Sequence, residues 1–583
     1  MSFIPSRLKT DPETETEAKD EVAKAVDPPL SYIDILFDHV GYLESNNGGI
    51  GPADSMSGKS VGIVGAGPAG LVAAHLLTKQ GADVTVFESS DRVGGRVFSM
   101  RPAGLTDGAI FEMGAMRVPP SERIFGYYAD QIGMSHQPFP DPGKPNVPTK
   151  IVFQNKAYDY CESNPPSMFK NVSDGWGAFA KMLEKTIGHL LKKESSFDQA
   201  QKEWQRLIYQ PVGAGCKSTG PEKSYSLISF YQGLVQAFVE NPEEFNCTRW
   251  TEKDFALFGA LGVGSGGFGP LYQVNFAELC RLVINGLESD QRLYTEGLDA
   301  LPKWLEGQLK QPVLFNTTVT NVVGATGGNP VSIHSTGARG STVAYFDVAI
   351  VATTNRSMQI DMGITESVDG SLDFPPEVNT SLRELHLMNS SKLFVLTKSR
   401  FWGNGIPQNI QTDGLVRGLY CLDYPNTKYG VVLVSYTWGD DSTKLIAIKD
   451  PNERLSILLQ SLRGIDAEIE KFVDILEGEI LPQYTRIIDW QEEEHYYGAF
   501  KLNYPGQDGR NRSAYFQYQN PDRKVILAGD SVGWCGGWIE SALQTGVNAA
   551  CGAAKVVVGA RALGDNPPTD CNPGYNYGPD EQS

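Results

Sequence analysis

Short apolar runs separated by glycine-rich or polar turns are the first regular pattern in the chain. Residues 60–64 form one such run, a glycine-rich turn at 65–70 and a helical stretch follow, and a second run covers 82–87. Short continuous apolar runs bounded by turns are typical of strands that are buried on both faces. Comparable runs recur at 345–353 and 524–530. The pattern therefore predicts one parallel sheet assembled from three separated segments of the chain.

The rest of the chain divides into a helical part and a part with alternating strands. Helical periodicity dominates residues 166–290, whereas residues 314–323, 383–398 and 430–438 alternate between apolar and polar positions, as half-buried strands do. Residues 119–165 are rich in proline and aromatic side chains and predict loops with short strands. The sequence therefore predicts an α/β protein whose structural units are interleaved along the chain.

The turn between the first two strands carries a Gly-x-Gly-x-x-Gly motif. Gly65 permits the tight turn, Gly67 lets the backbone approach a pyrophosphate, and Gly70 lets the helix pack close to the strand. Ala69 lies at the start of the helix, where free N–H groups can face the phosphates. Glu88 closes the second strand about 20 residues further on, where an acid can bind the ribose hydroxyls. A structural glycine turn is the alternative, but the strands and the acid in register favour dinucleotide binding.

A second motif follows at once, Asp91-Arg92-Val93-Gly94-Gly95-Arg96. Gly95 and the glycine before it allow backbone to come close to a ligand. Arg92 and Arg96 can each hold phosphate oxygens with paired hydrogen bonds. A basic surface turn is the alternative. Together the two motifs favour FAD over NAD as the dinucleotide.

Composition and charge exclude several classes of partner. The chain has 583 residues and a formal net charge of −19, which argues against nucleic acid and anionic membranes as partners. No apolar run approaches the roughly 20 residues of a membrane span, and the first 30 residues show no signal-peptide core. We therefore expect a soluble protein, cytoplasmic rather than secreted. The 8 cysteines and 7 histidines show no metal-ligand spacing, so no metal is expected.

From Val61 to about Ala554 the chain resembles the flavin amine oxidase family, and within it the L-amino acid oxidase branch, including bacterial relatives that act on lysine, arginine or phenylalanine. The motifs that carry the resemblance occur in the order of the family. They are the two motifs above, Gly114-Ala115-Met116-Arg117, Glu296-Gly297-Leu298-Asp299-Ala300-Leu301-Pro302, and Gly529-Asp530 with Gly536-Gly537-Trp538-Ile539-Glu540.

The resemblance implies a Rossmann-like FAD-binding domain of the glutathione reductase type, with an interleaved α+β substrate domain and a helical subdomain. The FAD-binding domain is expected to be discontinuous, and so is the substrate domain. The expected divisions are an N-terminal arm at 1–57, the FAD-binding domain at 58–118, 292–355 and 500–560, the substrate domain at 119–165 and 356–499, the helical subdomain at 166–291, and a tail at 561–583.

The resemblance also implies roles for individual residues. Arg117 is expected to hold the substrate carboxylate, because a planar guanidinium matches a carboxylate with two parallel bonds; a structural ion pair is the alternative. Lys392 matches the lysine of the family that holds a water near flavin N5, with an exposed strand lysine as the alternative. Residues 489–500 contain no cysteine, so the resemblance implies non-covalent FAD. The further cofactor contacts expected are Gly114, Met116, Arg117, Val319, Trp490, Gly529, Asp530, Trp538 and Ile539.

The substrate pocket is expected to combine a site for the amine with a site for the side chain. Gly537 and Trp538 match the segment that faces the substrate amine. Aromatic residues on the strand at 430–438 and before it are candidates for the side-chain pocket, although such residues more often belong to a core. They are Tyr420, Tyr436 and Trp438. The nearby Asp423, Asp440 and Asp441 suggest a cationic substrate, L-arginine or L-lysine, with large aromatic side chains second; solvated turn residues are the alternative.

These residues together predict an FAD-dependent L-amino acid oxidase that produces a 2-oxo acid, ammonia and hydrogen peroxide. Its expected partners are an L-amino acid and O2, with no nucleic acid and no membrane, and the enzyme is expected to be a homodimer. A decarboxylating amino acid 2-monooxygenase that gives an amide shares these motifs and stays open. Arg117 disfavours a polyamine or monoamine oxidase, and Arg117 with Lys392 disfavours a flavin-binding protein without turnover.

Overall fold

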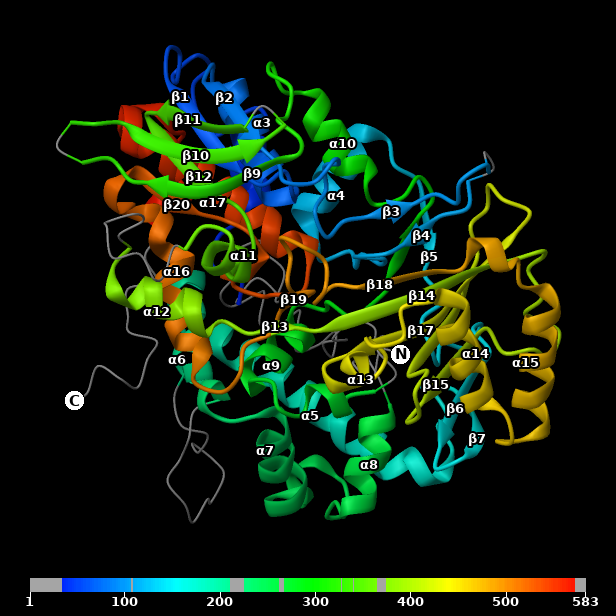
Figure 1. Ribbon diagram of the computed structural model, residues 1–583. Coiled ribbons are helices and arrows are strands. Elements are labelled where there is room, and N and C mark those ends of the chain that lie inside the picture. Colours follow the sequence, from blue (N-terminus) through cyan, green and yellow to red (C-terminus); the bar gives the residue numbers. More distant parts are fainter. Residues whose placement is uncertain are drawn as a thin grey trace.

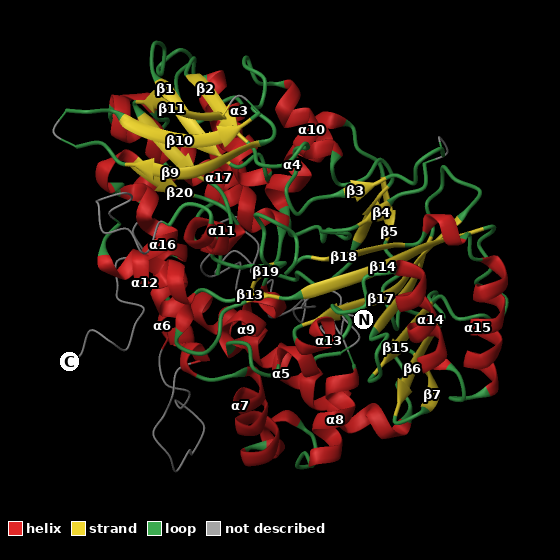
Figure 2. Cartoon of the chain, viewed as in Figure 1, coloured by secondary structure: helices red, strands yellow, loops and turns green. Residues whose placement is uncertain are grey.

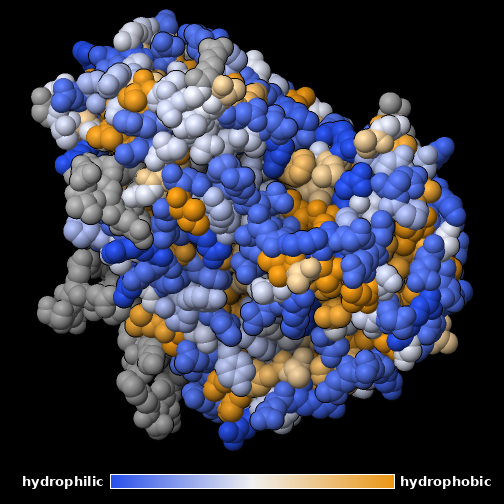
Figure 3. Space-filling view, viewed as in Figure 1, coloured by the Kyte–Doolittle hydropathy of each residue, from blue (hydrophilic) through white to orange (hydrophobic). Residues whose placement is uncertain are grey.

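The computed structural model describes residues 34–105, 108–209, 225–261, 267–326, 328–338, 340–363 and 374–571. The expected N-terminal arm up to residue 33 and the end of the expected tail lie outside these residues. Figure 1 shows two regions of β-structure, one around β1 and β12 and one around β14 and β17, with the helices α5, α7 and α8 below them. Figure 2 shows the same division by element type. The face in Figure 3 is mostly hydrophilic, in keeping with the formal net charge of −19.

The first β-region is a parallel sheet with strand order β2-β1-β12-β20. Its strands come from three separated segments, which confirms the parallel sheet expected from the apolar runs and the α/β, Rossmann-like fold that the resemblance implied. Helix α3 follows β1 directly, and α17 packs against α3. The bounds are β1 (Ser60–Val64), β2 (Asp83–Phe87), β12 (Val348–Val351), β20 (Val525–Leu527), α3 (Pro68–Lys79) and α17 (Ile539–Val558).

Two of the expected strands are shorter than the sequence pattern suggested. The run 345–353 is split at Asp347, whose carboxylate accepts a hydrogen bond from the backbone N–H of Ser60 at 2.8 Å, so that β11 ends before it and β12 begins after it. The run 314–323 becomes a strand only from Thr317, because Asn316 has a φ of 51° that interrupts extended backbone. The second of these strands joins an antiparallel sheet, β9 (Thr317–Val323), β10 (Val331–Gly337) and β11 (Gly340–Phe346).

The second β-region is a seven-stranded sheet with order β18-β14-β17-β16-β15-β6-β7. It joins strands from residues 149–160 to strands from residues 390–489, so the two expected segments of the substrate domain share one sheet. The bounds are β6 (Thr149–Phe153), β7 (Lys156–Tyr160), β14 (Ser390–Thr397), β15 (Asn409–Thr412), β16 (Gly418–Leu422), β17 (Gly430–Trp438) and β18 (Arg486–Asp489), with α14 (Pro451–Leu462) and α15 (Ala467–Glu479) packed on one face.

The alternating pattern at 383–398 was only partly right. Residues up to Glu384 belong to helix α12 (Pro376–Glu384), because a proline at the first helical position fixes the helical φ and needs no N–H partner. Strand β14 begins at Ser390, and all its side chains are buried rather than alternately exposed. This strand lies between β17 and β18, and the helices α14 and α15 cover the sheet, which explains the complete burial.

The helical part packs around aromatic side chains, with the Trp176 ring at 5.3 to 5.7 Å from four phenylalanine rings. Its elements confirm the helical periodicity of residues 166–290 in the described stretches. They are α5 (Ser167–Lys193), α6 (Phe197–Tyr209), α7 (Phe230–Val235), α8 (Glu252–Ala260) and α9 (Phe276–Ile284).

Residues 34–57 do not form the arm that the sequence predicted. Helix α2 (His39–Ser45) lies here, and Leu43 and Ile50 are completely buried in the core of the first β-region. The backbone of Ile50 accepts a hydrogen bond from Gly564 N–H at 2.9 Å, so the expected arm and the expected tail pack together. None of the described helices combines the length and apolar character that crossing a bilayer requires.

The remaining elements connect these parts. The connecting helices are α4 (Arg123–Ile132), α10 (Ala300–Gly307), α11 (Asn355–Ile360), α13 (Asp440–Thr443) and α16 (Gln507–Tyr515). The short strands form two-stranded pairs, β3 (Ser99–Met100) with β4 (Phe111–Glu112), β5 (His136–Pro138) with β8 (Arg292–Tyr294), and β13 (Leu387–Met388) with β19 (Phe500–Lys501).

Candidate active site

A long pocket runs from the carboxyl ends of β1, β2 and β12 to the strands β14 and β17 of the second sheet. Its walls come from all three parts of the chain, including α9 of the helical part. In open parallel sheets, ligands bind at the carboxyl ends of the strands. The position of the pocket therefore agrees with the dinucleotide motif.

The glycine motif has the geometry that the sequence predicted. Gly65 has a φ of 100°, and a Cβ on Gly70 would lie 2.0 Å from the carbonyl oxygen of Gly65, so both positions exclude larger residues. A Cβ on Gly67 would meet nothing within 4 Å, and Gly67 lines the pocket as the N-cap of α3. The open space beside Gly67, at a helix N-terminus, fits a pyrophosphate.

Glu88 is buried at the end of β2 and lines the pocket. Its Oε2 accepts a hydrogen bond from Ala66 N–H at 2.7 Å, and its Oε1 accepts one from Ser90 N–H at 2.9 Å. These bonds fix the carboxylate beside the glycine turn. This position is consistent with the ribose contact predicted for Glu88. The hydrogen bond from Ala66 N–H means that Glu88 also stabilises the glycine turn.

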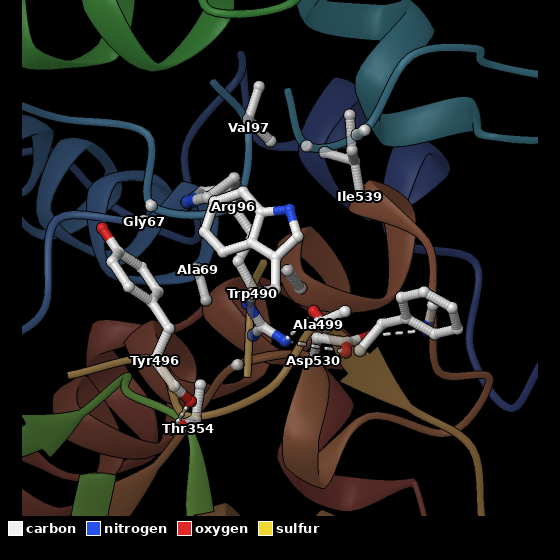
Figure 4. A pocket seen from close by; sticks show the side chains of 18 of the residues that line it. Gly67, Ala69, Arg96, Val97, Thr354, Trp490, Tyr496, Ala499, Asp530 and Ile539 are labelled. Carbon is white, nitrogen blue, oxygen red and sulfur yellow. Dashed lines mark hydrogen bonds and ion pairs between the residues drawn. The ribbon is translucent and has the colours of Figure 1, made fainter. Parts of the chain in front are cut away.

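The two arginines of the second motif have different positions. Arg96 lines the pocket and donates to the carbonyl of Ala499 at 2.8 Å and to Asp530 Oδ2 at 3.4 Å. Figure 4 shows this group together, with dashed lines between Arg96, Ala499 and Asp530. Arg92 instead lies over the Phe98 ring, 3.9 Å from its centroid, and is not among the described lining residues. A direct phosphate contact is therefore expected of Arg96 rather than of Arg92.

Asp530 fixes the loop that carries Gly537. Its Oδ1 accepts a hydrogen bond from Gly537 N–H at 2.8 Å, and its Oδ2 accepts one from Lys501 N–H at 3.0 Å. Asp530 was expected as a cofactor contact, and the structure places it in the pocket wall while it holds this loop. The other predicted cofactor contacts that line the pocket are Ala69, Gly95, Gly114, Met116, Val319, Trp490, Gly529, Trp538 and Ile539.

Trp490 forms a buried wall near the centre of the pocket. Its Nε1 donates to the carbonyl of Met113 at 3.0 Å, and its ring lies 5.3 Å from that of Tyr496 in an edge arrangement. Figure 4 shows the Trp490 ring among Gly67, Arg96 and Ile539, with Tyr496 at one side. The predicted place of Trp490 against the cofactor is consistent with this arrangement. Tyr496 and Thr354, which also line the pocket, were missed, because nothing in their sequence context distinguishes them.

Lys392 is 2% exposed on β14, so it is not the exposed strand lysine that was the alternative. Its Nζ donates to the carbonyl of Glu112 at 2.9 Å and also to the carbonyl of Gly114. Burial lowers the pKa of Lys392 to about 7, with the positive charge of Arg117 acting in the same direction and Glu112 opposing it. An amine that titrates near neutral pH can hold or release a proton at Nζ inside the pocket.

Arg117 lies in the loop after β4 and forms an ion pair, the alternative named for it above, with a partner that the sequence did not specify. Its Nη1 donates to Oε2 of Glu288 at 2.6 Å and its Nη2 donates to Oε1 at 3.1 Å. Burial alone would lower the pKa of Arg117, but the charge of Glu288 raises it, so the guanidinium stays cationic. Glu288 follows α9, lines the pocket, and could not be found from the sequence, because it is 171 residues away from its partner.

Aromatic side chains line the pocket near Arg117 and near Lys392. The Arg117 guanidinium lies 5.9 Å from the Trp538 ring. The ring centroids of Phe500 and Trp438 are 5.2 Å apart, and those of Trp438 and Tyr436 are 5.6 Å apart. The Tyr436 ring in turn lies 4.8 Å from Lys392 Nζ. Leucines from the helical part complete the lining, and the sequence reasoning did not anticipate them. They are Leu271, Leu279 and Leu282.

The acids expected to meet a cationic substrate are engaged elsewhere. Asp441 pairs with Arg417 and with Lys444, both at 2.7 Å. Asp423 accepts hydrogen bonds from Trp402 and Gln408. Asp423, Asp440 and Asp441 are not among the described residues that line the pocket. Tyr420, which was expected in the side-chain pocket, is completely buried and is not among them either. The acids that suggested an L-arginine or L-lysine substrate therefore give no support to it.

Residues 68–554 match the family described as flavin containing amine oxidoreductase. The chain belongs to this family. The match begins inside the glycine motif and covers the Arg117 loop, Lys392 and the Asp530 segment, and membership makes the protein a flavin-dependent oxidoreductase with FAD as its cofactor. The FAD predicted from the two motifs is thus confirmed, and its non-covalent attachment stays a prediction.

The relatives within the family correct the predicted activity. The chain is 37% identical over 581 residues to tryptophan 2-monooxygenase of Pseudomonas savastanoi, with 94% of this chain and 98% of the relative covered. It is 36% identical to tryptophan 2-monooxygenase of Pantoea agglomerans pv. gypsophilae, with the same coverage. An L-amino-acid oxidase of Siganus canaliculatus is 24% identical, with 87% and 88% covered. The prediction of an L-amino acid oxidase is therefore wrong, and the alternative that the motifs left open, a decarboxylating monooxygenase, is better supported.

Solved structures of the family share the fold. A redesigned putrescine oxidase superposes with a TM-score of 0.60 at 18% identity, covering 85% of this chain and 98% of the other. Cyclohexylamine oxidase from Brevibacterium oxydans gives a TM-score of 0.60 at 17% identity, with 85% and 99% covered. At these identities the likeness concerns the fold alone, and it agrees with the two sheets described above.

The buried position of Lys392 leads to a prediction about the oxidative half-reaction. Lys392→Met should slow the reoxidation of reduced flavin by O2 by about 100-fold, the scale of a positioned proton donor or acceptor, and should change amino acid binding much less. Because burial lowers the pKa of Lys392 to about 7, wild-type reoxidation should change across neutral pH, and this inflection should vanish in the variant. Stopped-flow spectroscopy of both half-reactions measures each effect.

Lys398 provides the matched control, because it follows the same strand but is exposed and donates to the carbonyl of Gly478. Lys398→Met should leave both half-reactions unchanged. Reoxidation that is equally fast in Lys392→Met and in wild type would reduce Lys392 to a structural residue.

Proposed function

We propose that the protein is a decarboxylating amino acid 2-monooxygenase that acts on L-tryptophan. The overall reaction converts the amino acid and O2 into indole-3-acetamide, CO2 and water. The proposal is supported by identity to tryptophan 2-monooxygenases over 94% of the chain. An oxidase would instead release an imino acid that hydrolyses to a 2-oxo acid and ammonia, with hydrogen peroxide as the second product.

One observation in the pocket carries the choice of substrate. Beyond the Arg117–Glu288 pair, the wall is built from Tyr436, Trp438 and Phe500 together with leucines of the helical part. Large aromatic side chains supply a rigid apolar wall at a low entropic cost, and their edges pack favourably with another ring system. An indole ring fits such a wall, whereas a cationic side chain placed there would lose its hydration beside residues that carry no negative charge.

The residues of the chain would divide the work as follows. FAD, when bound, accepts the hydride from Cα and passes the electrons to O2. Arg117 binds the substrate carboxylate and, with Trp538 on the amine side, orients Cα toward the cofactor. Lys392 holds a proton at Nζ beside the carbonyls of Glu112 and Gly114.

Retention of the oxidised substrate distinguishes a monooxygenase from an oxidase. The imino acid must stay in the pocket until oxygen has been reduced, so that peroxide can add to the imino carbon. The bond between that carbon and the carboxylate then breaks, CO2 leaves, one oxygen atom remains in the amide and the other leaves as water. The aromatic wall supports this retention, because it shields the imine carbon from bulk water and holds the indole ring.

The test is a screen of L-amino acids in air that records O2 uptake and the mass of each product. We expect the highest kcat/KM for L-tryptophan, with indole-3-acetamide as its product. Tryptamine, which lacks only the carboxylate, is the matched control and should be a poor substrate. A profile led by basic, small or acidic amino acids would contradict the assignment of the substrate.

A further inference from the structure

We propose that Glu288 is an internal competitor for Arg117, and that the incoming substrate carboxylate takes over the guanidinium while Glu288 accepts a proton from water. Substrate binding would then be coupled to the uptake of one proton. The proposal rests on the proposed function in one respect only, that the ligand carries a carboxylate and an indole ring. It assigns Glu288 a positioning role, because the residue acts on substrate through Arg117.

The contact between the two side chains has the form that a substrate carboxylate would need. Both oxygens of Glu288 bind one edge of the guanidinium, at 2.6 Å from Nη1 and 3.1 Å from Nη2. A planar guanidinium binds a carboxylate in this paired geometry. The side chains of Arg117 and Glu288 are only 10% and 3% exposed, so water does little to screen a second carboxylate. A substrate carboxylate therefore meets an arginine whose charge Glu288 already balances.

The surrounding groups make an added negative charge costly. Asp141 is a second buried carboxylate, 4% exposed, that interacts with both members of the pair. Burial raises the pKa of Asp141 and of Glu288, and Arg117 lowers both. Lys392 carries only part of a positive charge near neutral pH, because burial lowers its pKa to about 7. Among the described residues, the tyrosines Tyr420 and Tyr436 also interact with the pair.

Protonation of Glu288 offsets the negative charge that the substrate carboxylate adds, and it needs no other change in the pocket. The Arg117 guanidinium then faces one charged carboxylate, that of the substrate, and the net charge of the buried cluster stays the same. Neutral Glu288 also has an O–H that can donate to the incoming carboxylate. The proton comes from bulk solvent, and no bond other than the new O–H bond forms. Above the pKa of Glu288 in the free enzyme, affinity for a carboxylate ligand should fall as pH rises, by up to about tenfold per pH unit.

The experiment compares two ligands of nearly equal shape on the FAD-loaded enzyme. Indole-3-acetate carries the carboxylate, indole-3-acetamide carries an amide in its place, and neither has an amine that can be oxidised at Cα. Calorimetry in two buffers with different ionisation enthalpies gives the number of protons taken up on binding. At pH 8 we expect about one proton for indole-3-acetate and none for indole-3-acetamide. In Glu288→Gln the uptake with indole-3-acetate should disappear, and its Kd should lose most of its dependence on pH.

Two control variants identify the group that takes up the proton. Asp141→Asn and Lys392→Met should each retain the uptake if Glu288 is the acceptor. Uptake that persists in Glu288→Gln, or that is absent from wild type, overturns the inference and leaves the proposed function intact. If Glu288→Gln fails to fold, a Kd for indole-3-acetate that is constant from pH 6 to 9 in wild type overturns it as well. Indole-3-acetate that does not bind at all would overturn both the inference and the proposed substrate.

Discussion

Arg117→Ala should lower kcat/KM for L-tryptophan by about 30- to 4,000-fold while FAD stays bound. The carboxylate of the substrate must leave water to enter the pocket, and a buried ion is tolerated only with a matched partner. Removing one partner of a buried charge pair costs about 2–5 kcal/mol, and each factor of ten in rate corresponds to about 1.4 kcal/mol. Steady-state kinetics on the flavin-loaded fraction measures the loss.

Several controls separate the lost substrate contact from a disturbed fold. Glu288 would remain buried without its partner in Arg117→Ala, so Arg117→Ala/Glu288→Gln should relieve any loss of stability without restoring activity. Arg117→Lys should recover only part of the activity, because an ammonium cannot form the paired contact. The kcat/KM for tryptamine, which is expected to be a poor substrate of the wild type, should fall little in Arg117→Ala. Amino acid turnover within about threefold of wild type, well under 1 kcal/mol, would place the carboxylate elsewhere.

Gly67→Ala should give a folded protein whose affinity for FAD is reduced by about 5- to 150-fold. The backbone of Gly67 has a φ of −76°, which alanine adopts without strain, and the added Cβ meets nothing within 4 Å in the protein itself. The same methyl group would project into the space where a pyrophosphate approaches the backbone. Overpacking of this kind costs about 1–3 kcal/mol, at about 1.4 kcal/mol per factor of ten. FAD titration of the apoprotein gives the affinity.

Two control substitutions help to interpret this result. Gly70→Ala should damage the fold as well as the cofactor site, because its Cβ would lie 2.0 Å from the carbonyl oxygen of Gly65. Gly177→Ala, within helix α5 and with nothing near its Cβ, should keep normal FAD affinity and gain up to about 1 kcal/mol of stability. If Gly67→Ala binds FAD as tightly as Gly177→Ala does, the pyrophosphate does not lie at this turn.

The cofactor end of the site could be predicted from the sequence because its signals are local. Gly65, Gly67 and Gly70 are set by a turn of six residues, and Glu88 follows one helix and one strand later. Each of these positions is fixed by backbone geometry that tolerates few residue types. The buried strands β1, β12 and β20 were equally visible, because their apolar runs are short and continuous.

The substrate end could not be predicted, because its properties depend on partners far apart in the chain. Arg117 and Glu288 are 171 residues apart, and no periodicity connects them. The acids that suggested a basic substrate are close to β17 in the sequence, but one of them, Asp441, forms ion pairs with Arg417 and Lys444. A sequence shows that a carboxylate is present and not whether it is already paired. For the same reason the leucines of α9 were missed, since apolar helix residues face a core as readily as a pocket.

The most direct test of the proposed reaction is a turnover of L-tryptophan under ¹⁸O2 with all products counted. A decarboxylating monooxygenase should give one equivalent of indole-3-acetamide with one ¹⁸O atom in its carbonyl group, one equivalent of unlabelled CO2, and no accumulated hydrogen peroxide. Unlabelled 2-oxo acid with equal amounts of ammonia and hydrogen peroxide would contradict the account and identify the enzyme as an oxidase.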